Sequence, residues 1–235
     1  MTLNSIIKKG KIPVLLAPMA GVTDLPFRNV VSKFGVDMVF SEMIADHSVL
    51  SRDVKNQKIE LGTSFSNTAV QLAGCEPKAM GEAAKIVSDL GARAIDINMG
   101  CPAKKVVGGY SGSALMRDLK KASAIIESVV NAVDIPVSLK ARLGWDDYTK
   151  NAKELGQLAE KCGVQLFTIH ARTRNQFYKG FADWNAILEV KRAVTIPVIA
   201  NGDIVDIRSA SEALKLSETD GLMIGRGVIG KPWLI

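Results

Sequence analysis

Short runs of apolar and β-branched residues recur along the whole chain, and most are continuous rather than alternating with polar positions. Continuous runs of this kind are typical of parallel strands that are buried on both faces. We therefore predict eight strands, at residues 14–17, 38–41, 69–72, 94–97, 137–139, 166–169, 197–200 and 221–224.

Amphipathic stretches with helical spacing lie between these strands, for example at residues 77–90, 120–132, 151–162 and 184–193. Gly91 and Gly163 follow two of the stretches, and glycine commonly ends a helix. Eight strands that alternate with helices predict an α/β protein, a (β/α)8 TIM barrel over residues 1–235. A doubly wound open sheet is the alternative architecture.

The last residues of the chain depart from the barrel plan. Only residues 225–235 follow the eighth predicted strand, and they include Gly227, Gly230 and Pro232. A barrel needs an eighth helix of roughly ten or more residues to cover its last and first strands. We therefore expect a barrel without its last helix, which either borrows cover from a partner or is part of a longer protein.

Composition places the chain among globular proteins of a reducing compartment. With 47% hydrophobic and 23% charged residues, it is too apolar to be disordered. Cys75, Cys101 and Cys162 are an odd number of cysteines without the spacing of a metal site. We therefore predict no disulfide framework, no metal and a cytoplasmic location. A net charge of +6 permits a nucleic-acid or phosphate partner without requiring one.

Five of the predicted strands have a polar residue at or next to their carboxyl end, although a polar side chain in a buried strand is costly without partners. These residues are Gln71, Asn98, Lys140, His170 and Asn201. In a TIM barrel, the carboxyl ends of the strands and the loops after them form the active-site face. One such residue is more often a satisfied core residue, but five on one rim favour a functional site.

Two glycine-containing loops belong to the same face. Asn201, Gly202 and Asp203 follow the seventh predicted strand, and residues 225–227 (Gly-Arg-Gly) follow the eighth. Loops at these places often bind phosphate through backbone N–H groups, because glycine lets the anion approach closely. Residues 225–230 also match a dinucleotide-binding pattern, but no βαβ continuation follows. The predicted phosphate site therefore depends on barrel geometry alone.

Cys101 follows the fourth predicted strand in the segment Asn-Met-Gly-Cys-Pro, residues 98–102. An ordinary thiol, with a pKa of about 8.5, is largely protonated at neutral pH and can act as a general acid without tuning. A small buried hydrophobic residue is the commonest fate of a free cysteine, and that fate suits Cys75 and Cys162. A turn on the predicted active-site face favours a catalytic role for Cys101, with the glycine-rich residues 108–112 as a candidate lid.

Basic residues gather near this face. Residues 101–121 hold five lysines and arginines against one aspartate. The strand ends and the loops after them add Lys140, Arg142, Arg172, Arg174 and Lys179. Such charges suit a phosphate backbone, although a solvated surface explains Lys120 and Lys121 as well.

Together these residues resemble the tRNA-dihydrouridine synthases, in particular their bacterial B-type, nitrogen-regulation-like branch. The matching segments occur in the family's order over nearly the whole chain, at residues 16–28, 41–43, 71–74, 96–102, 112–116, 140–142, 170–174, 201–203 and 225–227. Met-Gly-Cys-Pro at 99–102 combined with His-Ala-Arg-Thr-Arg at 170–174 is highly specific.

The resemblance implies an FMN enzyme that reduces the C5–C6 double bond of particular uridines in tRNA, with NADPH as reductant. Cys101 would donate the proton to C5. Gln71 and Lys140 would hydrogen-bond to the flavin ring, and His170 would lie beside it. The residues expected to pack on the ring are Pro18, Met19 and Ala20, and those expected to hold the phosphate are Asn201, Gly202, Asp203, Gly225 and Arg226.

The same resemblance and the basic face imply contacts with the tRNA. Asn98 and Arg172 are candidates to stabilise the oxyanion that develops on uracil. Lys104, Lys105, Arg142 and Arg174 would hold the RNA around it. Family members usually carry a C-terminal helical domain that grips tRNA, and we expect this chain, a monomer, to lack it.

Two other interpretations stay open at this point. One is a flavin enzyme that acts on a free pyrimidine, of the dihydroorotate dehydrogenase type, which the basic face disfavours. The other is an RNA-binding barrel without turnover, which the presence of Cys101, Lys140 and His170 disfavours.

Overall fold

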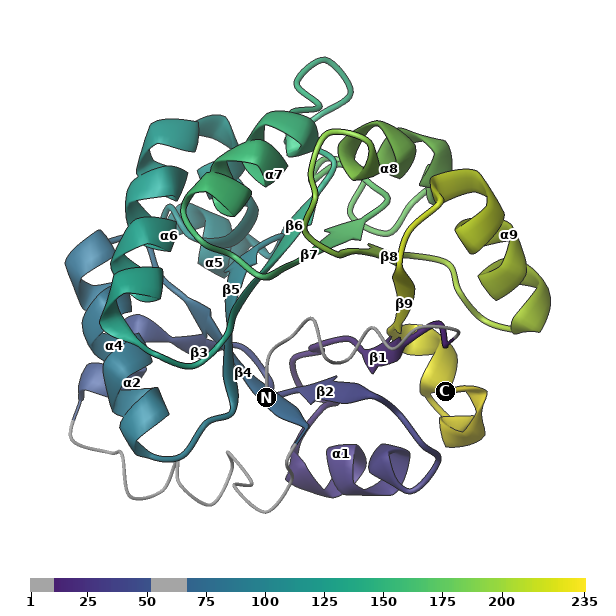
Figure 1. The fold of residues 1–235 in the computed structure, drawn as a ribbon, viewed down its shortest axis with the longest axis horizontal. Helices are drawn as coiled ribbons and strands as arrows, with labels where there is room; N and C mark the ends of the chain where they lie inside the picture. The colour runs from purple at the N-terminus through teal and green to yellow at the C-terminus, as the bar shows by residue number, and fades with distance from the viewer. Residues whose placement is uncertain (1–10, 52–66) are drawn as a thin grey trace.

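Parallel strands and helices alternate along the chain in a computed structural model that describes residues 11–51 and 67–235 (Figure 1). The strands are β1 (Val14–Leu16), β2 (Met38–Phe40), β3 (Ile44–Ala45), β4 (Thr68–Ala73), β5 (Ala94–Met99), β6 (Val137–Arg142), β7 (Leu166–His170), β8 (Val198–Asn201) and β9 (Gly221–Ile224). β9 pairs with β1, and β2 pairs with β4, so the sheet closes. β2 and β3 share one of eight barrel positions, because both pair with β4. The predicted TIM barrel is confirmed, and the open sheet is excluded.

Helices follow the strands and surround the barrel (Figure 1). They are α1 (Leu25–Ser32), α2 (Asp46–Leu50), α4 (Pro77–Asp89), α5 (Lys104–Gly108), α6 (Leu119–Ala132), α7 (Ala152–Lys161), α8 (Trp184–Lys191) and α9 (Ile207–Ser217), with the 3-10 helix η2 (Gly112–Arg117) between α5 and α6. Two further 3-10 helices, η3 (Arg226–Val228) and η4 (Pro232–Leu234), follow β9. Within the described residues, no helix combines the length and apolar character needed to cross a membrane.

Helix boundaries follow from capping residues. An aspartate side chain accepts a hydrogen bond from a backbone N–H in the first turn of α1, α6, α8 and α9; these residues are Asp24, Asp118, Asp183 and Asp206. Each such cap contributes about 1 kcal/mol. After α4 and α7, Gly91 and Gly163 adopt φ values of 100° and 96°, which favour glycine. Their predicted place at helix ends is confirmed.

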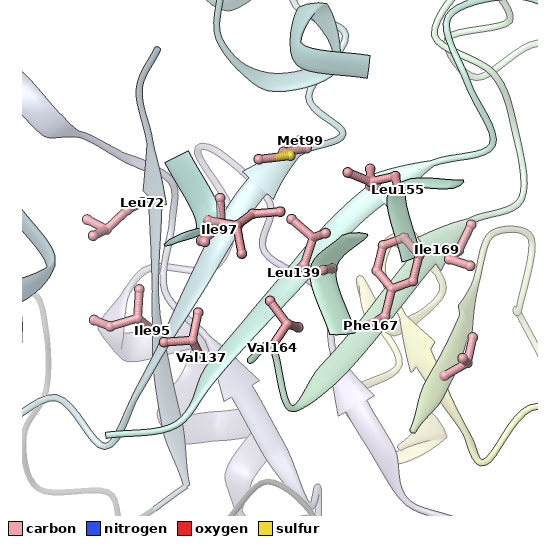
Figure 2. Close-up of a cluster of buried hydrophobic side chains, with 14 of the residues drawn as sticks. Leu72, Ile95, Ile97, Met99, Val137, Leu139, Leu155, Val164, Phe167 and Ile169 are labelled. Carbon is pink, nitrogen blue, oxygen red and sulfur yellow. The ribbon is translucent and has the colours of Figure 1, made fainter. Parts of the chain in front are cut away.

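Apolar side chains form two separate cores, one on each face of the sheet. The larger core lies between the strands and the helices and includes Ile95 and Ile97 of β5 (Figure 2). Alternate residues on a strand point to opposite faces, so Ala94 belongs to the smaller core inside the barrel. Phe40, Leu166 and six others complete that inner core. Burial on both faces explains why the strands are continuous apolar runs.

The barrel interior changes from apolar to polar along the strands. On β5, Ala94 is followed on the same face by Asp96 and Asn98. On β4, Ala69 is followed in the same way by Gln71. Because the strands are parallel, the polar residues collect at their carboxyl ends.

The second barrel strand is interrupted, which the sequence prediction of one strand at 38–41 does not capture. β2 ends at Phe40, and pairing with β4 resumes in β3. The hydroxyl of Ser41 accepts the backbone N–H of Gln71 at 3.0 Å, in place of a ladder bond. The carboxylate of Glu42 accepts the N–H of Gly21, so the interruption faces the turn after β1.

Candidate active site

The five polar strand ends lie together at the carboxyl end of the barrel. Lys140 Nζ donates to Asn201 Oδ1 at 3.1 Å, and Asn201 Nδ2 donates to the carbonyl oxygen of Met223 at 2.8 Å. Asn98 Nδ2 donates to Gln71 Oε1 at 2.8 Å. His170 lies opposite Asn201 in the β7–β8 register. The structure thus gathers residues from five strands into one polar layer.

Burial and positive charge set the protonation of this layer. Burial and the nearby charge of Arg142 together lower the pKa of Lys140 to about 8. Burial also lowers the pKa of His170 well below its ordinary value, and the cations of Arg142 and Lys140 act in the same direction. At neutral pH, His170 is therefore an uncharged hydrogen-bonding group, whereas Lys140 is still largely charged.

A hydrogen-bonded turn holds Cys101 beside the polar layer. Asn98 Oδ1 accepts from the backbone N–H of Gly100 at 3.1 Å and from that of Cys101 at 2.9 Å. The carbonyl oxygen of Cys101 accepts from the backbone N–H of Ser113 at 3.1 Å and from its hydroxyl at 2.9 Å. The backbone of Cys101 is thus fixed on both sides, while the residue itself stays partly exposed.

Arg142 is buried, with 2% of its surface exposed. Its guanidinium donates to the carbonyl oxygens of Gly100, Thr173 and Phe177 at 2.8–2.9 Å. Burial lowers its pKa to about 10, which leaves it charged at neutral pH. Arg142 therefore ties the Cys101 turn to the loop after β7. Its contact with RNA stays a prediction.

Arg172 is also 2% exposed and fastens the same loop. It donates to the carbonyl oxygens of Lys179 and Gly180 at 3.1 and 2.8 Å, and it pairs with Asp203 at 2.6 Å. Asp203 also accepts the N–H of Ala182 at 2.8 Å. The sequence prediction placed Asp203 at a phosphate and Arg172 at the substrate. The structure joins the two in an ion pair, and neither predicted contact is tested.

Tyr178 lies among the site cations, although the sequence analysis did not single it out. The guanidinium carbon of Arg226 is 4.6 Å from the centroid of the Tyr178 ring, and that of Arg142 is 5.6 Å away. The centroid of His170 lies 6.3 Å from that of Tyr178. An aromatic residue between basic residues, a few positions after a strand end, is the signal that would have pointed to it.

The loops predicted to hold a phosphate meet the turn after β1. A Cβ atom on Gly202 would lie 2.9 Å from Cδ2 of His170, so glycine leaves room for the imidazole ring. A Cβ atom on Gly225 would lie 3.6 Å from Sδ of Met19. The strands that carry these segments, β8, β9 and β1, are consecutive in the barrel. Residues 18–20 and the two glycine loops therefore adjoin at the same end.

The remaining predicted RNA contacts lie at the edge of this end. Lys104 and Lys105 are exposed at the start of α5, directly after the Cys101 turn. Arg174 stacks on Trp145, with its guanidinium carbon 4.6 Å from the ring centroid, and Arg117 lies 4.8 Å from the same centroid. Trp145 is a further residue that the sequence analysis missed. Among the described residues, no group of three or more histidine, cysteine or acidic side chains is placed to hold a metal ion.

Sequence comparisons with known proteins all match dihydrouridine synthases. A family model described as dihydrouridine synthase matches residues 15–235. A probable tRNA-dihydrouridine synthase of Rickettsia bellii is 55% identical over 236 residues, covering 98% of this chain and 72% of that protein. One from Rhodobacter capsulatus is 56% identical, covering 94% and 69%. The tRNA-dihydrouridine synthase B of Vibrio cholerae is 47% identical, also covering 94% and 69%.

Solved structures resemble the chain in fold alone. Histamine dehydrogenase from Rhizobium sp. 4-9 matches with a TM-score of 0.71 at 13% identity, covering 94% of this chain and 44% of that one. A 2-naphthoyl-CoA reductase complex matches with a TM-score of 0.66 at 12% identity, covering 94% and 49%.

Proposed function

The chain belongs to the dihydrouridine synthase family, and on this premise we propose that it reduces particular uridines of tRNA to 5,6-dihydrouridine, with bound FMN and with NADPH as reductant. The observation that carries the proposal is the polar carboxyl end of the barrel, where Lys140, Asn98 and the Cys101 turn lie together. Relatives named for tRNA favour this substrate over a free pyrimidine. We further propose that the enzyme acts as a cytoplasmic monomer.

The residues at this end fit a flavin mononucleotide. Such a ligand needs hydrogen-bond donors for its ring carbonyls and cations or N–H groups for its phosphate. Lys140 offers an ammonium group, and Gln71 has a second N–H besides the one that it gives to Asp96. Arg226 supplies a cation next to the adjoining glycine loops. We assign the ring to Gln71, Lys140 and His170, with residues 18–20 packed on it, and the phosphate to residues 201–203, Gly225 and Arg226.

The reaction then needs a hydride, a proton and a hydrogen-bond donor that stabilises the oxyanion on uracil. When bound, the flavin supplies a hydride to C6 of the uracil ring. The Cys101 thiol donates a proton to C5. Asn98 has one Nδ2–H beyond its bond to Gln71, and this N–H stabilises charge on the uracil carbonyl. The target base must leave its stack at a cost of a few kcal/mol, and Lys104, Lys105 and Arg174 hold the flanking phosphates.

The Cys101→Ala variant tests the role of the thiol. We expect the variant to bind FMN and to oxidise NADPH at the wild-type rate, because neither step needs the proton donor. The formation of dihydrouridine in tRNA that lacks it should fall by about a hundredfold or more. Flavin absorbance, stopped-flow reduction and mass spectrometry of digested tRNA measure the three quantities.

Cys162→Ala is the matched control, since Cys162 follows the C-terminal end of α7, away from the site. It should leave all three quantities unchanged. Dihydrouridine formation near the wild-type rate in Cys101→Ala would remove the proton-donor role. A wild-type protein with no affinity for FMN would contradict the proposed function itself.

A further inference from the structure

Asp96 is a buried carboxylate that the proposed chemistry does not use. It lies in the middle of β5 and is fully buried. Its Oδ1 atom accepts from the hydroxyl of Ser138 on β6, and its Oδ2 atom accepts from Nε2 of Gln71 on β4, both at 2.6 Å. Both partners lie directly opposite Asp96 in the strand register. Burial raises its pKa to about 6, a cost that an apolar residue would avoid.

The carboxylate determines which way the amide of Gln71 faces. An ionised carboxylate only accepts hydrogen bonds, so the NH2 group of Gln71 faces Asp96 and its oxygen faces away. That oxygen accepts from Nδ2 of Asn98 at 2.8 Å. The orientation of the first amide therefore sets the orientation of the second, with the oxygen of Asn98 toward the turn after β5.

The last link reaches the backbone of Cys101. Asn98 Oδ1 accepts the N–H groups of Gly100 and Cys101 at 3.1 and 2.9 Å. A reversed Asn98 amide would place its NH2 group against these two donors. The N–H groups of Gly100 and Cys101 and the NH2 group of Asn98 would then all lack an acceptor there. The series from Asp96 through Gln71 and Asn98 to Cys101 is thus consistent in one direction only.

We propose that Asp96 is a positioning residue, which acts through Gln71 and Asn98 to fix the backbone of Cys101 and so the place of its thiol. The consequence for catalysis rests on the proposed function of that thiol. The hydrogen-bond relay does not, because all of its members are groups of this chain.

Backbone amide exchange tests the relay directly. In Asp96→Leu the acceptor for Gln71 is gone, so we expect the N–H of Cys101 to exchange with D2O about tenfold faster than in the wild type. Asp96→Asn keeps the shape and a carbonyl acceptor, and it should stay within about threefold of the wild type. Exchange followed by ¹⁵N NMR gives these rates.

Ser138→Ala is the matched control for the same carboxylate. It removes a hydrogen bond of the same length, 2.6 Å, but on the side of Asp96 away from Cys101. A purely structural role for Asp96 would make Asp96→Leu and Ser138→Ala alike at the Cys101 N–H, and that result would overturn the proposal. If Asp96→Leu does not fold, Gln71→Met interrupts the same relay, and wild-type protection of the Cys101 N–H in Gln71→Met would overturn it equally.

Single-turnover kinetics test the consequence for the reaction. With enzyme reduced beforehand, Asp96→Leu should reduce tRNA about tenfold more slowly than the wild type, and Asp96→Asn should restore the rate. Flavin reduction by NADPH at saturating FMN should be equal in all of them. Equal tRNA reduction by Asp96→Leu and the wild type would refute the positioning role. A wild type that forms no dihydrouridine would instead refute the proposed function, and the exchange rates would still decide the relay.

Discussion

Lys140 shows how its surroundings make the charge of one side chain depend on pH close to neutrality. It is the ammonium group of the polar layer, with Asn201 as its hydrogen-bond acceptor. Because burial lowers its pKa to about 8, it loses its charge just above neutral pH. His170 is already uncharged there, since its pKa is lowered well below the ordinary value. Lys140 is therefore the group in this pair whose charge changes between neutral and mildly alkaline pH.

If protonated Lys140 holds FMN as proposed, the association constant for FMN should stay level near neutral pH and fall as the pH rises above about 8. Fluorescence quenching of FMN, titrated between about pH 7 and about pH 9, measures it. Lys140→Met should bind FMN more weakly and show no such fall. Lys120→Met, on an exposed position of α6, should behave as the wild type. An equal fall in Lys140→Met would assign the pH dependence to another group.

Single residues could be predicted from sequence where polarity interrupts a buried run. Gln71, Asn98 and His170 stand out in this way, and the structure brings them to one end of the barrel. Asp96 lies in the same kind of run but three positions before the end of β5, so the sequence analysis included it only within the matching segment 96–102. The ion pair of Arg172 with Asp203 joins residues 31 positions apart, and no local pattern contains that distance.

The loop between β7 and α8 shows how an element without regular structure is held by buried cations. Arg142 reaches it from β6, and Arg172 donates to its backbone from within. Together they place Tyr178 against Arg226. The helices and strands themselves could be predicted from the spacing of apolar residues and from helix-end residues, because those signals are local in the sequence. The form of this loop could not, because its hydrogen bonds come from other strands.

Arg172→Lys tests how firmly this loop is held. The single ammonium group of lysine cannot reach all three acceptors that the guanidinium reaches. It therefore leaves the carbonyl oxygen of Lys179 or Gly180 without a partner, beside the ion pair with Asp203. We expect the free energy of unfolding, measured in urea, to fall by about 2 kcal/mol or more. Arg192→Lys, in an exposed pair with Glu218, should change it by less than about 0.5 kcal/mol. Equal losses of unfolding free energy in the two variants would mean that Arg172 does not stabilise the loop between β7 and α8.

At the scale of the whole molecule, the barrel separates two environments along its axis. The interior is apolar toward the amino ends of the strands and polar and cationic at their carboxyl ends. Parallel strands could be predicted to produce this polarity, because every strand contributes its last residues to the same end. The net charge of +6 does not by itself say where the basic residues lie, but the structure does. Lys104 and Lys105 lie at the polar end, whereas Lys161 and Lys215 lie near the helix ends that lead into β7 and β9.

The salt dependence of tRNA binding distinguishes binding by Lys104 and Lys105 from a general effect of the positive net charge. If Lys104 and Lys105 each neutralise one phosphate, their double change to glutamine should lower the slope of log Kd against log salt by about 1.4 to 1.8. The double change of Lys161 and Lys215 to glutamine removes the same charge from the opposite end and should leave the slope unaltered, because the fields of those residues are screened over about 8–10 Å. Filter binding at several KCl concentrations measures all three slopes. Equal reductions in both double variants would show that tRNA responds to net charge, and the assignment of Lys104 and Lys105 to the RNA contact would be wrong.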